Sequence, residues 1–143
     1  ENNTMLKKTI KYTDYNGRER SEDFYFNLSK AEIAEMELTT QGGLQNMLSR
    51  FIKAEDQPSL FKVFKEFILK TYGERDVDGK RFIKNNGELA KAFVETEAYS
   101  ELFIELISSP NAMSDFVLAV IPADMAAKMP KDPEELSKIA LAE

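Results

Sequence analysis

Hydrophobic and polar residues alternate along the first part of the chain, with a period of two. The apolar members of this alternation are Leu6, Ile10, Tyr12, Phe24, Phe26 and Leu28. Such a period is typical of β-strands that bury one face. The pattern therefore predicts two strands that form an N-terminal β-hairpin. Because an isolated pair of strands is only marginally stable, the apolar face is expected to pack on helices.

The connection between these strands determines which residues oppose each other. A two-residue turn at Asn16-Gly17 would pair even positions with odd ones and split the apolar residues between two faces. A three-residue loop over residues 15–17, with Gly17 in a left-handed conformation, instead sets Leu6 opposite Phe26 and Tyr12 opposite Arg20. We therefore predict the three-residue loop.

A helix-start signal follows the second strand directly. Ser29 and Glu32 have the spacing of a capping box, in which each side chain accepts a hydrogen bond from a free amide of the first turn. Leu28 and Ile33 occupy the flanking hydrophobic-staple positions. The sequence predicts a helix from here to the segment 39–43.

Apolar residues then recur every three or four positions, which predicts further helices. The stripes are Leu44, Met47, Leu48, Phe51 and Ile52; Leu60, Phe61, Val63, Phe64, Phe67, Ile68, Leu69 and Tyr72; Leu89, Ala92 and Phe93; Tyr99, Leu102, Phe103, Leu106 and Ile107; and Met113, Phe116, Val117, Val120 and Ile121. The helix that opens near Pro58 is apolar around much of its circumference, so it is predicted to be central and to end at Gly73. Residues 73–81 are predicted to be a polar loop, and Phe82-Ile83 is too short to assign.

The predicted fold class is α+β and mainly α, with an N-terminal β-hairpin packed on a bundle of about five to six helices. Residues 5–122 form this domain, and residues 123–143 form a flexible C-terminal tail in which Asp132 and Pro133 open a short nascent helix. Met5 is interpreted as the natural start, and residues 1–4 as an expression remnant or a short extension.

Composition narrows the possible functions. The chain has 25 acidic and 19 basic residues, a net charge of −6, and no His, Cys or Trp. Relays through His, zinc sites of His or Cys, haem ligation by these residues and iron–sulfur clusters are excluded. Carboxylate, lysine, tyrosine or oxygen-ligated metal chemistry remains open to an enzyme, although we expect neither an enzyme nor a cofactor. The acidic balance argues against nucleic-acid binding, and no apolar run approaches the roughly 20 residues that span a membrane.

Two acidic clusters are candidate sites. Asp76, Asp78 and Gly79 resemble a calcium loop, but Asn85 stands where the bidentate Glu is required, so an ordinary turn is the better interpretation. Glu97, Glu101 and Glu105 form an acidic stripe at helical spacing, which cannot be a di-iron motif because His is absent. The stripe is interpreted as a solvated face or as a docking surface for a basic partner.

The hairpin is locally basic, and the chain is rich in Phe and Met. The basic residues Lys7, Lys8, Lys11, Arg18 and Arg20 are interpreted as charges that block edge-to-edge pairing of strands, with nucleic-acid binding as the alternative. Most Phe and Met side chains must be core. An exposed Phe and Met face would suit the binding of apolar helices of varied sequence.

Several segments resemble the tail assembly chaperones of long-tailed phages and prophages of Gram-positive bacteria. They are residues 5–17 (MLKKTIKYTDYNG), 22–32 (EDFYFNLSKAE), 35–38 (EMEL), 41–44 (QGGL), 78–84 (DGKRFIK) and 99–103 (YSELF). None of them is a catalytic signature. The resemblance covers nearly all of the predicted domain.

This resemblance implies a non-enzymatic factor that acts in the host bacterial cytoplasm and is absent from the mature virion. Proteins of the family bind the long, helical tape measure protein, keep it soluble and help to recruit tail tube subunits, and they tend to form homo-oligomers. They are commonly made in two forms by a ribosomal frameshift, so residues 123–143 would belong to the short form. A groove lined by Phe and Met would accept an amphipathic tape measure helix.

The family provides no motif that identifies contact residues, so these are inferred from pattern alone. The inferred partner-binding positions are Glu97, Glu101, Glu105, Leu136 and Ile139. Two other functions stay open: a structural neck or tail component of the virion, and a small regulator or inhibitor of a host protein.

Overall fold

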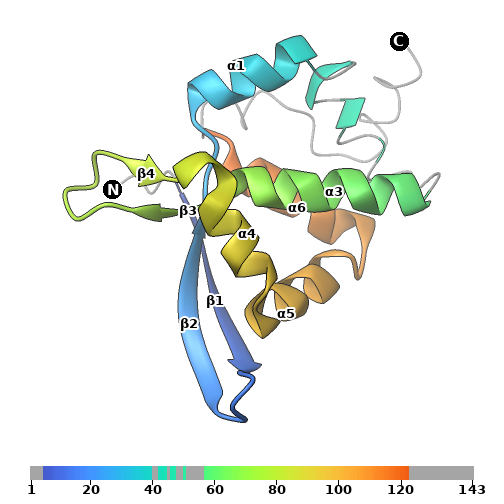
Figure 1. Cartoon of the computed structure of the whole chain (residues 1–143). Coiled ribbons are helices and arrows are strands. Elements are labelled where there is room, and N and C mark those ends of the chain that lie inside the picture. The colour runs from blue at the N-terminus through green and yellow to red at the C-terminus, as the bar shows by residue number, and fades with distance from the viewer. Residues whose placement is uncertain (1–4, 40–41, 45, 48–49, 51–56, 123–143) are drawn as a thin grey trace.

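The computed structural model describes residues 5–39, 42–44, 46–47, 50 and 57–122, and it confirms the predicted fold class. The strands are β1 (Leu6–Thr13), β2 (Glu19–Phe26), β3 (Tyr72–Arg75) and β4 (Phe82–Ile83); the helices are α1 (Lys30–Thr39), α3 (Gln57–Thr71), the 3₁₀-helix η1 (Asn85–Gly87), α4 (Glu88–Val94), α5 (Glu97–Leu106) and α6 (Pro110–Val120). Residues 43–44, 46–47 and 50 are also helical. The β1–β2 and β3–β4 hairpins project from the helices in different directions (Figure 1).

The predicted register of the N-terminal hairpin is confirmed. Leu6 opposes Phe26 and Tyr12 opposes Arg20 in the antiparallel pair of β1 and β2. Gly17 has a φ of +81°, and its N–H donates to the carbonyl of Asp14 at 2.9 Å. The Asp14 carboxylate also accepts hydrogen bonds from the N–H groups of Asn16 and Arg18. Asp14, the residue that precedes the loop, therefore closes it through its carbonyl and its carboxylate.

The capping box at the start of α1 is also confirmed. The Ser29 N–H donates to Glu32 Oε1 at 2.8 Å, and the Glu32 N–H donates to Ser29 Oγ at 3.1 Å. Leu28 and Ile33, the predicted staple residues, are both buried. Local sequence alone thus determined how the strand passes into the helix.

The end of α3 differs from the prediction. The helix stops at Thr71, and Tyr72, which was assigned to the helix, opens β3 and pairs with Phe26 of β2. Its ring stacks on Phe93 with the centroids 4.3 Å apart. Gly73 does not end the helix. Glycine is required there because the Phe82 ring packs against its backbone, and a Cβ would lie 2.7 Å from that ring. Residues 73–75 of the predicted loop thus belong to β3, the unassigned pair Phe82-Ile83 is β4, and the sheet has the order β1-β2-β3-β4.

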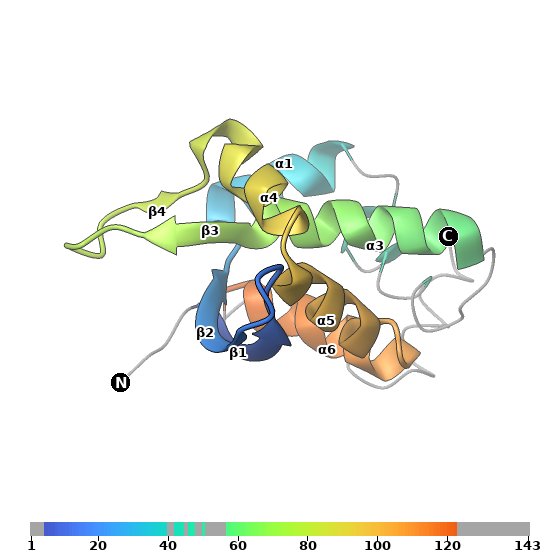
Figure 2. The ribbon, with the colours of Figure 1, turned by 60° about the horizontal axis from the view of Figure 1, so that its bottom comes forward.

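The core lies between the sheet and the helices. α5 and α6 lie side by side and pack beside the β1–β2 hairpin (Figure 2). α3 is central, as predicted, and buries Leu60, Phe64, Phe67 and Ile68. In α4, Ala90 is buried and Ala92 is exposed, which corrects the predicted apolar face of that helix. Leu44 and Met47 of the predicted second stripe are buried, while Leu48, Phe51 and Ile52 lie outside the described residues.

The helices of the described part of the chain are short for a membrane span. Over the described ranges, no single helix is long and apolar enough to cross a bilayer, although α5 and α6 meet the requirement together as a bent pair. Most of the apolar side chains of these two helices belong to the core, among them Leu102, Leu106, Phe116 and Val117.

Replacing Tyr99 with phenylalanine is expected to raise the free energy of unfolding by about 1 kcal/mol. The Tyr99 hydroxyl is buried and has no hydrogen-bond partner among the described residues, and an unsatisfied buried donor is destabilising by about that amount. Urea titration measures the change. Tyr12→Phe is the matched control, since its hydroxyl donates to Glu22 and its removal should give no gain. A less stable Tyr99→Phe protein would contradict the prediction.

Candidate functional site

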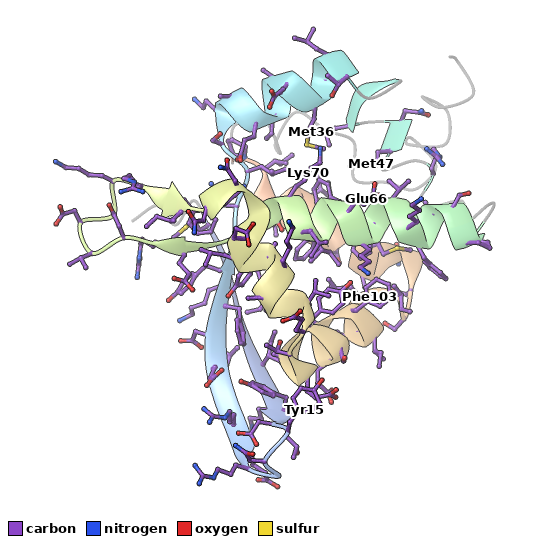
Figure 3. The ribbon with its side chains drawn as sticks, in the orientation of Figure 1. Tyr15, Met36, Met47, Glu66, Lys70 and Phe103 are labelled. Atoms are coloured by element: carbon purple, nitrogen blue, oxygen red, sulfur yellow. The ribbon has the colours of Figure 1, made fainter. Side chains whose placement is uncertain are left out.

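A groove of about 540 Å³ lies between α1, the end of α3, η1 and the start of α4. Its floor consists of the apolar side chains of Leu28, Met36, Leu69 and Ala90, and its charged edges carry Glu32, Glu35, Lys70, Lys84 and Lys91. Figure 3 shows Met36 pointing from α1 toward α3, the helix that carries Lys70. The groove thus has an apolar floor with an acidic edge on α1 and a basic edge on α3 and α4.

Lys84 closes one end of this groove. Its Nζ lies 2.9 and 3.0 Å from the two carboxylate oxygens of Glu32, and it donates to the backbone carbonyls of Asn27 and Lys70. Burial lowers the pKa of the Lys84 ammonium, and the hydrogen bonds that it donates to Glu32 oppose that effect. A cation here also suits the C-terminal end of α3, because the last carbonyls of a helix carry the negative end of its dipole. Lys84 therefore joins the first turn of α1 to the last turn of α3.

The backbone beside Lys84 is sharply turned. Asn85 and Asn86 both have a φ of +55°, and Gly87 has a φ of +86°. Asn and Gly are the residues that adopt this left-handed region most readily. The run Asn85-Asn86-Gly87 was a turn signal that the sequence analysis did not use, and it would have marked where η1 places Lys84 against Glu32.

The acidic stripe on α5 already has partners within the chain. Lys8 Nζ of β1 lies 2.9 Å from Glu105 Oε2, and the Tyr15 hydroxyl donates to Glu97 Oε2 at 2.9 Å. The bond to Glu97 raises the pKa of Tyr15. Glu101 is exposed between them. Two of the three predicted docking residues thus hold the hairpin on α5, and their role toward another protein stays a prediction.

The basic residues of the hairpin are partly used in the same way. Arg20 forms ion pairs with Asp14 and Glu22, and Glu22 also accepts a hydrogen bond from Tyr12, which raises the pKa of Tyr12 to about 12. Lys8 is paired with Glu105. Lys7, Lys8 and Lys11 lie on β1, an outer strand of the sheet, which agrees with the protection of a strand edge, whereas Arg20 lies on β2.

The remaining candidates are placed differently. The Asp76 carboxylate accepts hydrogen bonds from the N–H groups of Lys80 and Arg81, so it stabilises the turn between β3 and β4. Within the described part of the chain, no group of three Asp or Glu side chains is arranged to hold a metal ion. Leu136 and Ile139 lie outside the described residues.

Comparison with known proteins gives one family. A family model described as phage tail assembly chaperone matches residues 5–141, and this match extends beyond the predicted domain boundary at residue 122. No curated protein and no solved structure matches the chain.

Proposed function

The chain belongs to the phage tail assembly chaperone family, and from this premise we propose that it binds the tape measure protein and keeps it soluble while tail tube subunits are recruited. A role as a chaperone in tail assembly follows from the family itself. The client, the recruitment of the tube protein, the absence of an enzymatic activity, the action in the bacterial cytoplasm and the absence from the virion are parts of the proposal.

The observation that supports the proposal is the groove between α1, α3 and α4. An apolar floor that includes Met36 suits helices of varied sequence, because the Met side chain is flexible and polarizable. This is the groove geometry expected for one turn or two of an amphipathic helix. The tape measure protein is long and helical in this family, so many weak contacts along it would replace one strong contact.

Charge on the two edges of the groove gives the bound helix a direction. Glu32 and Glu35 line the α1 edge, and Lys70 and Lys91 line the opposite edge. A client helix with basic residues on one flank of its apolar stripe and acidic residues on the other would satisfy both edges. Complementary charges of this kind favour one orientation and exclude others more than they add affinity.

Co-expression with the tape measure protein of the same phage tests the proposal. The chaperone is expected to keep the tape measure protein in the soluble fraction and to co-purify with it. Leu69→Lys places an unpaired charge on the groove floor, and the soluble tape measure protein should fall by at least about tenfold, the effect of about 1.4 kcal/mol. The matched control is Leu38→Lys. Leu38 lies on α1, one of the helices that form the groove, but it is 88% exposed and does not line the groove.

Circular dichroism and thermal unfolding of both variants separate a binding defect from a folding defect. The proposal fails if the tape measure protein stays insoluble with the unmodified chaperone. It also fails for this groove if a folded Leu69→Lys protein keeps the client as soluble as the Leu38→Lys control does.

A further inference from the structure

We propose that the chain's own C-terminal segment, residues 132–140, docks as a helix in the groove between α1, α3 and α4. In the absence of a client this segment would cover the apolar floor formed by Leu28, Met36, Leu69 and Ala90. The docking itself is independent of the proposed function, whereas its consequence, competition with a tape measure helix, rests on that function.

The first argument is where the described chain ends. The Leu28 N–H donates to the carbonyl of Val120 at 2.9 Å, and Leu28 is part of the groove floor. The end of α6 therefore lies beside the start of α1 (Figure 1). Residues 123–131 span up to about 30 Å when extended, at about 3.3 Å per residue, so residues 132–140 reach the groove easily.

The second argument is the pattern of the segment itself. Asp132 and Pro133 have the sequence pattern of a helix N-cap and a first helical residue, and Leu136, Ile139 and Ala140 would share one face of such a helix. This face is short, as the groove is. Its apolar residues would meet Met36 and Leu69, which otherwise have no described segment over them on the groove side.

Charge complementarity is the third argument. Glu135 borders the apolar face on the Ile139 side, and Ser137 borders it on the Ala140 side. When Glu135 faces the basic edge of Lys70 and Lys91, Ala140 and the uncharged Ser137 face the acidic edge of α1, where Glu35 lies. With the same face on the floor but the helix running in the opposite direction along the groove, Glu135 would face Glu35. The segment thus fits the groove in one orientation.

Because residues 132–140 are tethered to the domain, even a weak contact is sufficient for them to occupy the groove. A short linker gives an effective concentration in the millimolar range, so a segment with millimolar affinity would occupy the groove for about half of the time. A client must then displace it, which lowers the apparent client affinity by the fraction of open groove. Weak client helices would be rejected, and a long client with many helices would still bind.

The chain has no cysteine, so in the full chain a disulfide can form only between cysteines that are introduced. The test variant carries Ala140→Cys and Glu35→Cys, which keeps both lysines and both large apolar residues of the segment. The control carries Ala140→Cys and Val77→Cys, because Val77 is fully exposed on the β3–β4 turn, away from the groove. Under mild oxidation at low protein concentration, the test pair is expected to form an intramolecular disulfide at least about tenfold faster.

Leu136→Glu added to the test pair should lower its rate to that of the control pair, since a charge then replaces the central apolar contact. Equal rates for the test and control pairs would overturn the proposal. Disulfides that form only between two chains would also overturn it, and would identify the segment of a second copy as the occupant. None of these outcomes depends on the tape measure protein, so they are distinct from failure of the proposed function.

Discussion

Replacing Phe26 with alanine is expected to lower the free energy of unfolding by about 3–5 kcal/mol, the usual effect of removing a fully buried ring. Phe26 has no exposed surface, and its ring lies 5.5 Å from that of Phe116, 5.7 Å from Tyr72 and 5.9 Å from Phe93, measured between centroids. These rings come from α6, β3 and α4. One side chain therefore connects the hairpin to three separate parts of the chain.

Urea denaturation followed by circular dichroism measures this change. Tyr15→Ala is the control, because it removes an aromatic ring from the same hairpin at a position that is 74% exposed. Its loss should stay below about 1 kcal/mol, the value of one exposed hydrogen bond. Similar losses for both variants would mean that the Phe26 ring is not the junction described above.

Replacing Lys84 with methionine is expected to lower the free energy of unfolding by about 2–3 kcal/mol. Methionine keeps most of the apolar stem but removes the cation beside the Glu32 carboxylate and the Lys84 donor to the carbonyls of Asn27 and Lys70. The Ser29 N–H still donates to Glu32. The value is set below the full effect of a buried ion pair, because the Glu32 side chain is 39% exposed while that of Lys84 is 18% exposed. The same change should loosen α1 and widen the groove.

Lys91→Met is the matched control for this prediction. Lys91 lines the same groove, but its ion pair with Glu88 is 3.7 Å long and both side chains are largely exposed. Such a pair contributes at most about 0.5 kcal/mol. A double-mutant cycle of Lys84→Met with Glu32→Gln should give a coupling of about 1 kcal/mol or more. Additive effects of the two changes would contradict the assignment of Lys84 as the link between α1 and α3.

Features that depend on neighbouring residues were predictable from the sequence. The parity of apolar residues on either side of Gly17 was enough to derive the hairpin register, because a strand alternates its faces with a period of two. The capping box at Ser29 and Glu32 depends on residues three apart. In both cases the hydrogen bonds join residues that are close in sequence, so the pattern contains the whole interaction.

The third and fourth strands were not predictable in this way. Tyr72 follows Ile68 at helical spacing, and nothing nearby distinguishes it from another residue of α3. It leaves the helix because it pairs with Phe26 and stacks on Phe93. A short strand is stabilised mainly by its partner strand, and here that partner lies more than forty positions away in the printed sequence.

The sequence by itself determined the hairpin register, the start of α1, most of the helical stripes and the absence of sites that need His or Cys. Only the tertiary structure decided what the charges contact. It placed Lys8 against Glu105 and Lys84 against Glu32. The acidic stripe therefore holds the hairpin, and Lys84, whose role no sequence motif identified, closes one end of the groove. The reason is physical: a charge acts through space on whatever folding brings within a few ångströms, and periodicity along the chain does not record that distance.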